Sequence, residues 1–466
     1  MKRIAVAVTL GLTLVVAAAP ASATDTIGAP SVGDPYFPLD GNGGYQVDHY
    51  DLRLRYDPPI DELSGTTTIL ARATQDLTQF NLDFLLHPSS VLVNNRPAEF
   101  VNEDNGELVV RPAKMVRDGS TMLIVVRYRD NPDKYTRYGR DSWRPDGKGV
   151  LIASEPTIAP WWFPSNDHPT DKATYDVSMS VPGDLEFVST GIFLGTTPQP
   201  NGWKRWNWRG TSQQTTYLVT AAIGDFDLDI RSPSHIYAYE KNMVNGANAR
   251  EGFGRTPELI DYLESKFGDY PFEAMGGVGT ARQGGLEAQT RPFLGDGVFA
   301  SGPNVTTVLH ELAHQWFGDA VSVKQWRDLW LNEGFATYAE YLYSEDTGGE
   351  TAAARARATY DRFPADHGVW TVAVSDPPPI GTAHPAGSAI YYRGAMALQN
   401  LRTTVGDETF LTIMRTWVES KKDGNASTED FQAHAEQVAG RSLATVFDTW
   451  IYAAGKPATP PDQLSR

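Results

Sequence analysis

The 466-residue chain contains no cysteine. A disulfide framework is therefore excluded, and any transition-metal site must use histidine and carboxylate ligands. Positive charge is also scarce, because 40 Lys and Arg residues face 57 Asp and Glu residues and leave a formal net charge of −17. This excess of negative charge argues against nucleic acid or an anionic membrane surface as a partner.

Apolar runs long enough to cross a membrane are lacking too, and the one at the amino terminus is short. Residues 1–23 are organised like a secretory signal peptide, with a positively charged start, an apolar stretch from Ile4 to Ala19 and a cleavage site at Ala21–Ala23. We expect a secreted, extracellular protein that begins near Thr24 and has no stable membrane association. A membrane anchor is the alternative interpretation of this segment.

Length and periodicity predict two domains, since a chain of this size exceeds one ordinary core. Over residues 45–226 apolar and polar residues alternate, as around Tyr50, Leu52 and Leu54, and turn clusters rich in Pro, Asn and Gly separate the runs. This pattern predicts an N-terminal antiparallel β-sheet domain. A Gly- and Pro-rich leader over residues 24–44 precedes it.

Helical periodicity replaces the alternation after residue 226. Thr256 and Pro257 are typical of a helix start, and apolar residues follow at helical spacing. We therefore expect a mainly helical second domain over residues 227–455, which makes the fold class α+β, followed by a loose Pro-rich tail over 456–466. Further helical patterns cover Val305–Phe317, Glu333–Tyr343, Gly394–Val405 and Thr409–Glu419.

The string His310-Glu311-Leu312-Ala313-His314 indicates metal chemistry. Imidazoles at i and i+4 lie about one turn apart on one helical face, where both can reach a single ion. Glu333 stands at the start of the next helical pattern and is the candidate third ligand. Two His, one further protein ligand and an open position for water are typical of a catalytic zinc site, in which Glu311 would be the general base. One Zn²⁺ ion is the expected cofactor.

Simpler interpretations of these residues stay open. A surface helix can carry two His and a Glu by chance, and Glu333 could be an acid favoured by a helix amino terminus. In a real metal site, a ligating imidazole usually donates its other N–H to a carboxylate or carbonyl. Asp319 and Glu340 are the local candidates for that supporting role, although both could equally be solvated acids.

Longer strings around these residues resemble a known family. His310–Gly318 followed by Leu331–Ala336 looks like the zinc signature of the aminopeptidase N family of gluzincin metallopeptidases, and the resemblance covers about residues 45–455. It implies a thermolysin-like zinc catalytic domain over residues 227–455, with a small sheet whose edge strand lies along the substrate. The chain looks like a compact two-domain form of that family. Further strings that carry the resemblance are Glu155-Pro156-Thr157, Asp171–Tyr175, Phe267–Phe272 and Tyr391–Ala395.

The resemblance also implies roles outside the metal site. Gly284-Gly285-Leu286-Glu287-Ala288 is similar to the family's edge-strand string, in which the residue matching Glu287 binds the substrate's free amino terminus; the family has Asn where this chain has Ala288. Glu155 matches a second amine-binding acid, and Tyr391 matches the tyrosine that stabilises the oxyanion. These residue types suit the chemistry, because a desolvated carboxylate holds an ammonium and a phenol donates to developing negative charge. A solvated acid or a core tyrosine is the ordinary alternative for each.

These features together predict a secreted zinc aminopeptidase that hydrolyses the N-terminal residue from peptides with a free amino terminus. Glu311 would deprotonate the attacking water and then protonate the leaving amine. Two alternatives stay open. A secreted zinc endopeptidase would use the same metal site with Glu155 and Glu287 as ordinary acids, and a non-catalytic peptide-binding relative would keep only the fold.

Overall fold

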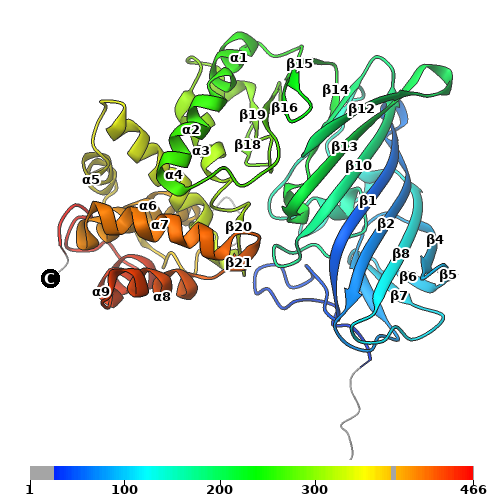
Figure 1. Ribbon diagram of the computed structural model, residues 1–466, viewed down its shortest axis with the longest axis horizontal. Helices are drawn as coiled ribbons and strands as arrows, with labels where there is room; N and C mark the ends of the chain where they lie inside the picture. The colour runs from blue at the N-terminus through cyan, green and yellow to red at the C-terminus, as the bar shows by residue number, and fades with distance from the viewer. Residues whose placement is uncertain (1–25, 379–384, 465–466) are drawn as a thin grey trace, which may run out of the picture.

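The computed structural model describes residues 26–378 and 385–464, so the predicted signal peptide lies outside the described residues. A β-sheet half and a helical half lie side by side in Figure 1, with a small sheet near their junction. Each half has its own buried hydrophobic cluster. Among the described residues, no helix has the length and apolar character that a membrane span requires.

The first half is organised around an eight-stranded sheet in the order β12-β13-β10-β1-β2-β8-β4-β5. The alternation seen in the sequence follows the two faces of β1, where Tyr50, Leu52 and Leu54 are fully buried and Arg53 and Arg55 are exposed. The strands of this half are β1 (Tyr45–Asp57), β2 (Glu62–Ala73), β3 (Phe80–Asp83), β4 (Pro88–Val93), β5 (Arg96–Pro97), β6 (Glu99–Asn102), β7 (Glu107–Arg111), β8 (Thr121–Asp130), β9 (Val150–Ile152), β10 (Ala173–Pro182), β11 (Glu186–Ser189), β12 (Ile192–Pro198), β13 (Trp203–Gln214) and β14 (Ala221–Gly224).

The predicted antiparallel β domain is confirmed, with one exception. β1 and β10 pair in parallel, with His49 opposite Thr174 and Arg55 opposite Ser180. Parallel neighbours need a long crossover connection, and the chain between β1 and β10 supplies it by first forming β2 to β9. Local alternation does not encode which distant strand becomes the neighbour, so this pair was missed.

The second half combines nine described helices with a five-stranded sheet, in the order β15-β16-β17-β19-β18. Its strands are β15 (Phe226–Ser232), β16 (His235–Glu240), β17 (Met275–Thr280), β18 (Gly285–Leu286) and β19 (Phe293–Gly295), and a separate pair is formed by β20 (Val321–Val323) and β21 (Gly424–Ala426). The helices are α1 (Gly246–Gly254), α2 (Thr256–Phe267), α3 (Val305–Ala313), α4 (Trp330–Asp346), α5 (Ala352–Arg362), α6 (Ala389–Val405), α7 (Asp407–Lys421), α8 (Thr428–Ala439) and α9 (Ala444–Phe447).

The segment predicted as a leader is tied into both halves. Phe37 is buried and packs edge-on against Trp326 of the helical half and Tyr138 of the sheet half. Asp34 accepts a hydrogen bond from the backbone N–H of Trp326 at 2.9 Å. This segment, blue in Figure 1, therefore runs between the two halves and links them.

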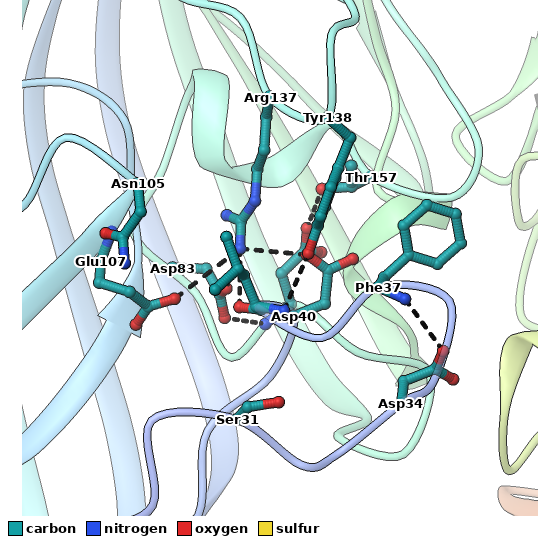
Figure 2. Close-up of polar contacts among 12 residues, drawn as sticks. Ser31, Asp34, Phe37, Asp40, Asp83, Asn105, Glu107, Arg137, Tyr138 and Thr157 are labelled. Carbon is teal, nitrogen blue, oxygen red and sulfur yellow. Dashed lines mark hydrogen bonds and ion pairs between the residues drawn. The ribbon is translucent and has the colours of Figure 1, made fainter.

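A buried charge cluster anchors the same segment to the β domain (Figure 2). The Nη2 atom of Arg137 lies 3.0 Å from Asp40, 2.8 Å from Asp83 and 3.8 Å from Glu107, and all four side chains are buried. Burial raises the pKa of the Asp83 carboxyl to about 6 and that of Glu107 to about 9. Removing one partner of a buried ion pair costs about 3–5 kcal/mol, so Arg137 is the residue on which this anchor depends.

The tail predicted to be loose is in fact packed over residues 456–464. The Lys456 ammonium donates to the carbonyl oxygens of Tyr360 and Phe363 at 2.8 and 2.7 Å. The Asn400 side chain donates to the carbonyl of Gln463 at 2.9 Å. A Pro-rich segment has few N–H donors but keeps its carbonyl acceptors, and the Tyr360 hydroxyl of α5 and the Asn400 amide of α6 donate to carbonyls of the tail, which its composition alone could not reveal.

Candidate active site

Helices α3 and α4 bring the predicted metal ligands together. α3 begins after Asn304, whose side chain caps the helix by accepting from the backbone N–H of Thr307 at 3.4 Å. α4 places Glu333 in its first turn. The Nε2 atoms of His310 and His314 lie 3.3 and 3.5 Å from the same oxygen of Glu333. The three ligand atoms all lie within 4.8 Å of one another, close enough for a single ion.

The hydrogen bonds of the two Nδ1 atoms show that the Nε2 atoms of His310 and His314 are the ones left to bind a metal. The Nδ1 of His310 donates to Glu340 at 2.8 Å, and the Nδ1 of His314 donates to the carbonyl of Phe317 at 3.1 Å. With the proton on Nδ1 in both rings, both Nε2 lone pairs face Glu333. Glu340 thus has the position expected of a supporting acid. The Asp319 carboxylate does not accept a hydrogen bond from the His314 ring, because the backbone turn after the helix brings the carbonyl of Phe317 to that nitrogen; Asp319 contacts His314 only through its backbone N–H, which donates to the His314 carbonyl at 3.0 Å.

This donor set fits zinc. Two neutral imidazole nitrogens and one carboxylate oxygen are typical of zinc sites that keep a position open for water. The supporting hydrogen bonds to both rings are of the kind that fix metal-ligating histidines. Among the described residues, His310, His314 and Glu333 form the one group of three or more potential ligands this close together.

Glu311 lies beside the ligand cluster and lines the same cavity. Burial raises the pKa of its carboxyl to about 7. A carboxyl group whose pKa lies near neutral pH is suited to take up and release a proton during a reaction. Strand β18 passes close by, since a Cβ built on Gly285 would lie 3.0 Å from Oε1 of Glu311.

The predicted edge strand is β18, at the end of the five-stranded sheet. Gly285 and Leu286 pair antiparallel with Leu294 and Phe293 of β19. Gly284 directly precedes the strand with φ of +99°, a conformation that favours glycine. The buried Glu287 follows directly, so its carboxylate enters the cavity from the sheet edge.

Glu155 comes from the β domain and lies in the same cavity as Glu287. Arg140 donates to its backbone carbonyl at 3.0 Å. One oxygen of its side chain is buried and has no hydrogen-bond partner, which is costly for a carboxyl group unless a ligand satisfies it. Burial and then the negative charge of Glu287 raise the pKa of Glu155 well above its usual range. The cavity holds about 400 Å³ and joins these two acids to the metal cluster.

Tyr391 reaches the cavity from α6, with its ring stacked on His310 at a centroid distance of 6.3 Å. The negative charge of Glu333, followed by burial, raises the pKa of the phenol well above its usual range, so the group stays protonated and can donate a hydrogen bond. A close contact between α4 and α6 fixes where Tyr391 lies. A Cβ on Gly334 would lie 3.0 Å from Cα of Gly394, so α4 and α6 meet backbone to backbone beside Glu333 and Tyr391.

Sequence reasoning missed Gln315, which connects the edge strand to the metal helix. Its side-chain amide donates to the carbonyl of Glu287 at 2.9 Å, and its carbonyl accepts from the backbone N–H of Thr290 at 2.7 Å. The fully buried Gln315 directly follows His314. A polar residue within an otherwise apolar stretch after the second histidine was the available signal.

Two His and one Glu beside a cavity that also holds a general-base candidate are what a zinc metallopeptidase needs, and here they lie in a helical domain joined to a β domain. The chain belongs to peptidase family M1. The family model described as the Peptidase M1 N-terminal domain matches residues 46–218, and the Peptidase family M1 domain matches residues 298–450. The family resemblance inferred from the strings is thereby confirmed.

Relatives of known name agree with this family. The chain is 26% identical over 454 residues to Aminopeptidase 2 of Candida albicans, and the aligned region covers 89% of this chain and 48% of the relative. It is 26% identical over 456 residues to a glutamyl aminopeptidase of Bitis rhinoceros, covering 89% and 47%. The chain therefore spans about half the length of these two relatives.

Two solved structures match over nearly their whole length. The M1 zinc metallopeptidase of Deinococcus radiodurans superposes with a TM-score of 0.82 at 27% identity, covering 93% of this chain and 99% of that one. A mutant M1 zinc metallopeptidase from the same organism, bound to a Tyr-Ser-Ala substrate, gives a TM-score of 0.82 at 28% identity with the same coverage. The predicted fold class, a β domain followed by a mainly helical catalytic domain, is confirmed.

Proposed function

We propose that this protein is a zinc aminopeptidase that removes the N-terminal residue from peptides. The observation that carries the proposal is the position of Glu155 and Glu287 in one cavity with His310, His314 and Glu333. Two carboxylates beside a metal cluster suit a substrate that presents a free ammonium next to its scissile bond. The names of the relatives and the peptide-bound structure support the same activity.

The roles of the residues in this proposal follow from their positions. His310, His314 and Glu333 would hold one zinc ion, which when bound supplies Lewis acidity at the scissile carbonyl and makes water more acidic. Glu311 takes the proton of the attacking water and returns it to the leaving amine. The phenol of Tyr391 donates a hydrogen bond to the negative charge that develops on the carbonyl oxygen.

Release of a single residue is the consequence of where the ammonium is held. Glu155 and Glu287 line the same 400 Å³ cavity as Glu311. A peptide whose amino terminus is fixed there has its first peptide bond beside the general base. An N-acetylated peptide cannot offer the ammonium and would leave the two buried carboxylates without a positively charged partner.

The Glu287→Gln variant tests this assignment. We expect kcat/KM for a peptide with a free amino terminus to fall about 10- to 100-fold, because the amide keeps the shape but loses a charge-assisted hydrogen bond. Cleavage should be followed by mass spectrometry for the free peptide and its N-acetylated copy. Glu251→Gln, on the exposed face of α1, is the matched control and should retain wild-type values.

The two alternatives predict other outcomes. A zinc endopeptidase would cleave the free and the acetylated peptide equally, and Glu287→Gln would leave both rates unchanged. A non-catalytic peptide-binding relative would bind the free peptide without releasing any product. Either result would overturn the aminopeptidase assignment.

Export is a further part of the proposal and rests on the sequence of residues 1–23 alone. Expression of the full chain in a secreting host, followed by N-terminal sequencing of the protein recovered outside the cells, should give a chain that begins near Thr24. A protein that stays in the cells with Met1 intact would contradict export and leave the enzymatic proposal untouched.

A further inference from the structure

A second cavity of about 420 Å³ adjoins the first at His310 and Tyr391. These two residues line both cavities, whereas Glu155, Glu287 and Glu311 line only the first. The walls of the second cavity come mainly from α4, α5 and α6. They include Glu340, Arg355, Arg362 and Tyr392.

The arrangement of the two cavities indicates in which direction the bound peptide runs. In the proposed reaction the ammonium lies with Glu155 and Glu287, and the scissile bond lies beside His310 and Tyr391. The part of the peptide that follows the scissile bond must then continue away from the two acids. The second cavity is the space that begins there, so it would hold the leaving group.

Two arginines of α5 determine which chemical group this cavity can bind. The Arg355 guanidinium lies 5.0 Å from the ring centre of Tyr341, and that of Arg362 lies 5.0 Å from the ring centre of Tyr392. Stacking on an aromatic ring uses the face of a guanidinium and leaves its N–H edge open to an acceptor. Within the described part of the chain, neither arginine forms an ion pair.

The acids near these arginines do not neutralise them. Glu340 is bound to the Nδ1 of His310 at 2.8 Å. Glu350 also lines the cavity, but it is exposed and no ion pair joins it to either arginine within the described residues. Two guanidiniums with open donor edges therefore face a cavity next to the reacting bond, and the group that matches them is a carboxylate.

We propose that Arg355 and Arg362 form a carboxylate-binding subsite for the leaving group. The carboxylate has two possible sources, the C-terminal carboxylate of a short peptide and the side chain of an acidic second residue. The inference rests on the proposed aminopeptidase function and adds a substrate class to it: short peptides, or peptides with Asp or Glu in second place.

Paired substrates test the subsite. The first pair is a dipeptide and its C-terminal amide. The second pair is a C-terminally amidated tripeptide with Glu or with Gln in second place. For at least one pair, the wild-type protein should show a kcat/KM ratio in favour of the carboxylate of about 10-fold or more, as expected for charge-assisted binding. The first pair reports the C-terminal source and the second reports the side-chain source.

The double variant Arg355→Gln, Arg362→Gln should bring that ratio close to one. Because each ratio compares two substrates of one protein sample, a general loss of folding cancels. Arg357→Gln is the matched control: Arg357 lies on the same helix, pairs with Asp361 at 2.9 Å and does not line the cavity, so its ratio should equal the wild-type ratio.

The substrate pairs distinguish failure of the subsite proposal from failure of the proposed aminopeptidase function. Ratios near one in the wild-type protein, or ratios that the double variant leaves unchanged, overturn the subsite while turnover itself still supports the aminopeptidase. A wild-type protein loaded with zinc that cleaves none of the four peptides overturns both.

Discussion

The Glu311→Gln variant is expected to lose about 10²- to 10⁴-fold in kcat, the range typical of removing a general acid–base group. The amide keeps nearly the same shape beside Gly285 but can no longer take the proton of the attacking water. Zinc binding should persist, because Glu311 is not one of the three residues whose ligand atoms cluster. Turnover, zinc content and thermal unfolding should be measured on the same preparation.

Glu419→Gln is the control for that experiment, since Glu419 lies exposed on α7 and far in sequence from the candidate site. Its turnover should equal that of the unsubstituted protein. Near-normal turnover of Glu311→Gln with zinc bound would remove Glu311 from the mechanism and would require another proton acceptor in the cavity.

Loss of a metal ligand should have an effect of comparable size. In Glu333→Ala, the two Nε2 atoms lose the carboxylate oxygen they share at 3.3 and 3.5 Å, and two imidazoles alone are a poor zinc site. A catalytic metal contributes several kcal/mol to transition-state stabilisation, which corresponds to roughly 10³-fold or more in rate. The unsubstituted protein should contain one zinc per chain after dialysis, and Glu333→Ala should contain almost none.

The Glu340→Gln variant should weaken zinc binding less than Glu333→Ala does. Its carboxylate supports His310 from behind, at 2.8 Å from Nδ1, and such supporting groups typically change metal affinity by about 10- to 100-fold. Added zinc should therefore restore Glu340→Gln but not Glu333→Ala. A Glu333→Ala protein that keeps one zinc per chain and its activity would contradict the ligand assignment.

The parts of the site that were predictable are those encoded by local spacing. His310 and His314 lie one helical turn apart, so their shared face follows from helix geometry alone. Glu340 was predicted as a supporting acid because it shares a helical face with Glu333, and it does contact His310. Asp319 was chosen for the same role from proximity in sequence, and the carbonyl of Phe317 takes its place.

The parts that were missed depend on contacts between distant segments. Gln315 acts through the edge strand, and the close approach of Gly334 to Gly394 depends on how α4 meets α6. Arg355 and Arg362 form a pattern only once α5 has packed beside α6. Composition and periodicity describe each segment by itself, so they cannot predict which distant segments come into contact.

The central claim is that a zinc site and two amine-binding acids make this protein an aminopeptidase. One measurement tests it most directly: incubation of the zinc-loaded protein with a peptide and its N-acetylated copy, with and without a chelator, and identification of the products by mass spectrometry. We expect release of the first residue from the free peptide alone, and the chelator should abolish it. Equal cleavage of both peptides, or product formation that the chelator does not affect, would contradict it.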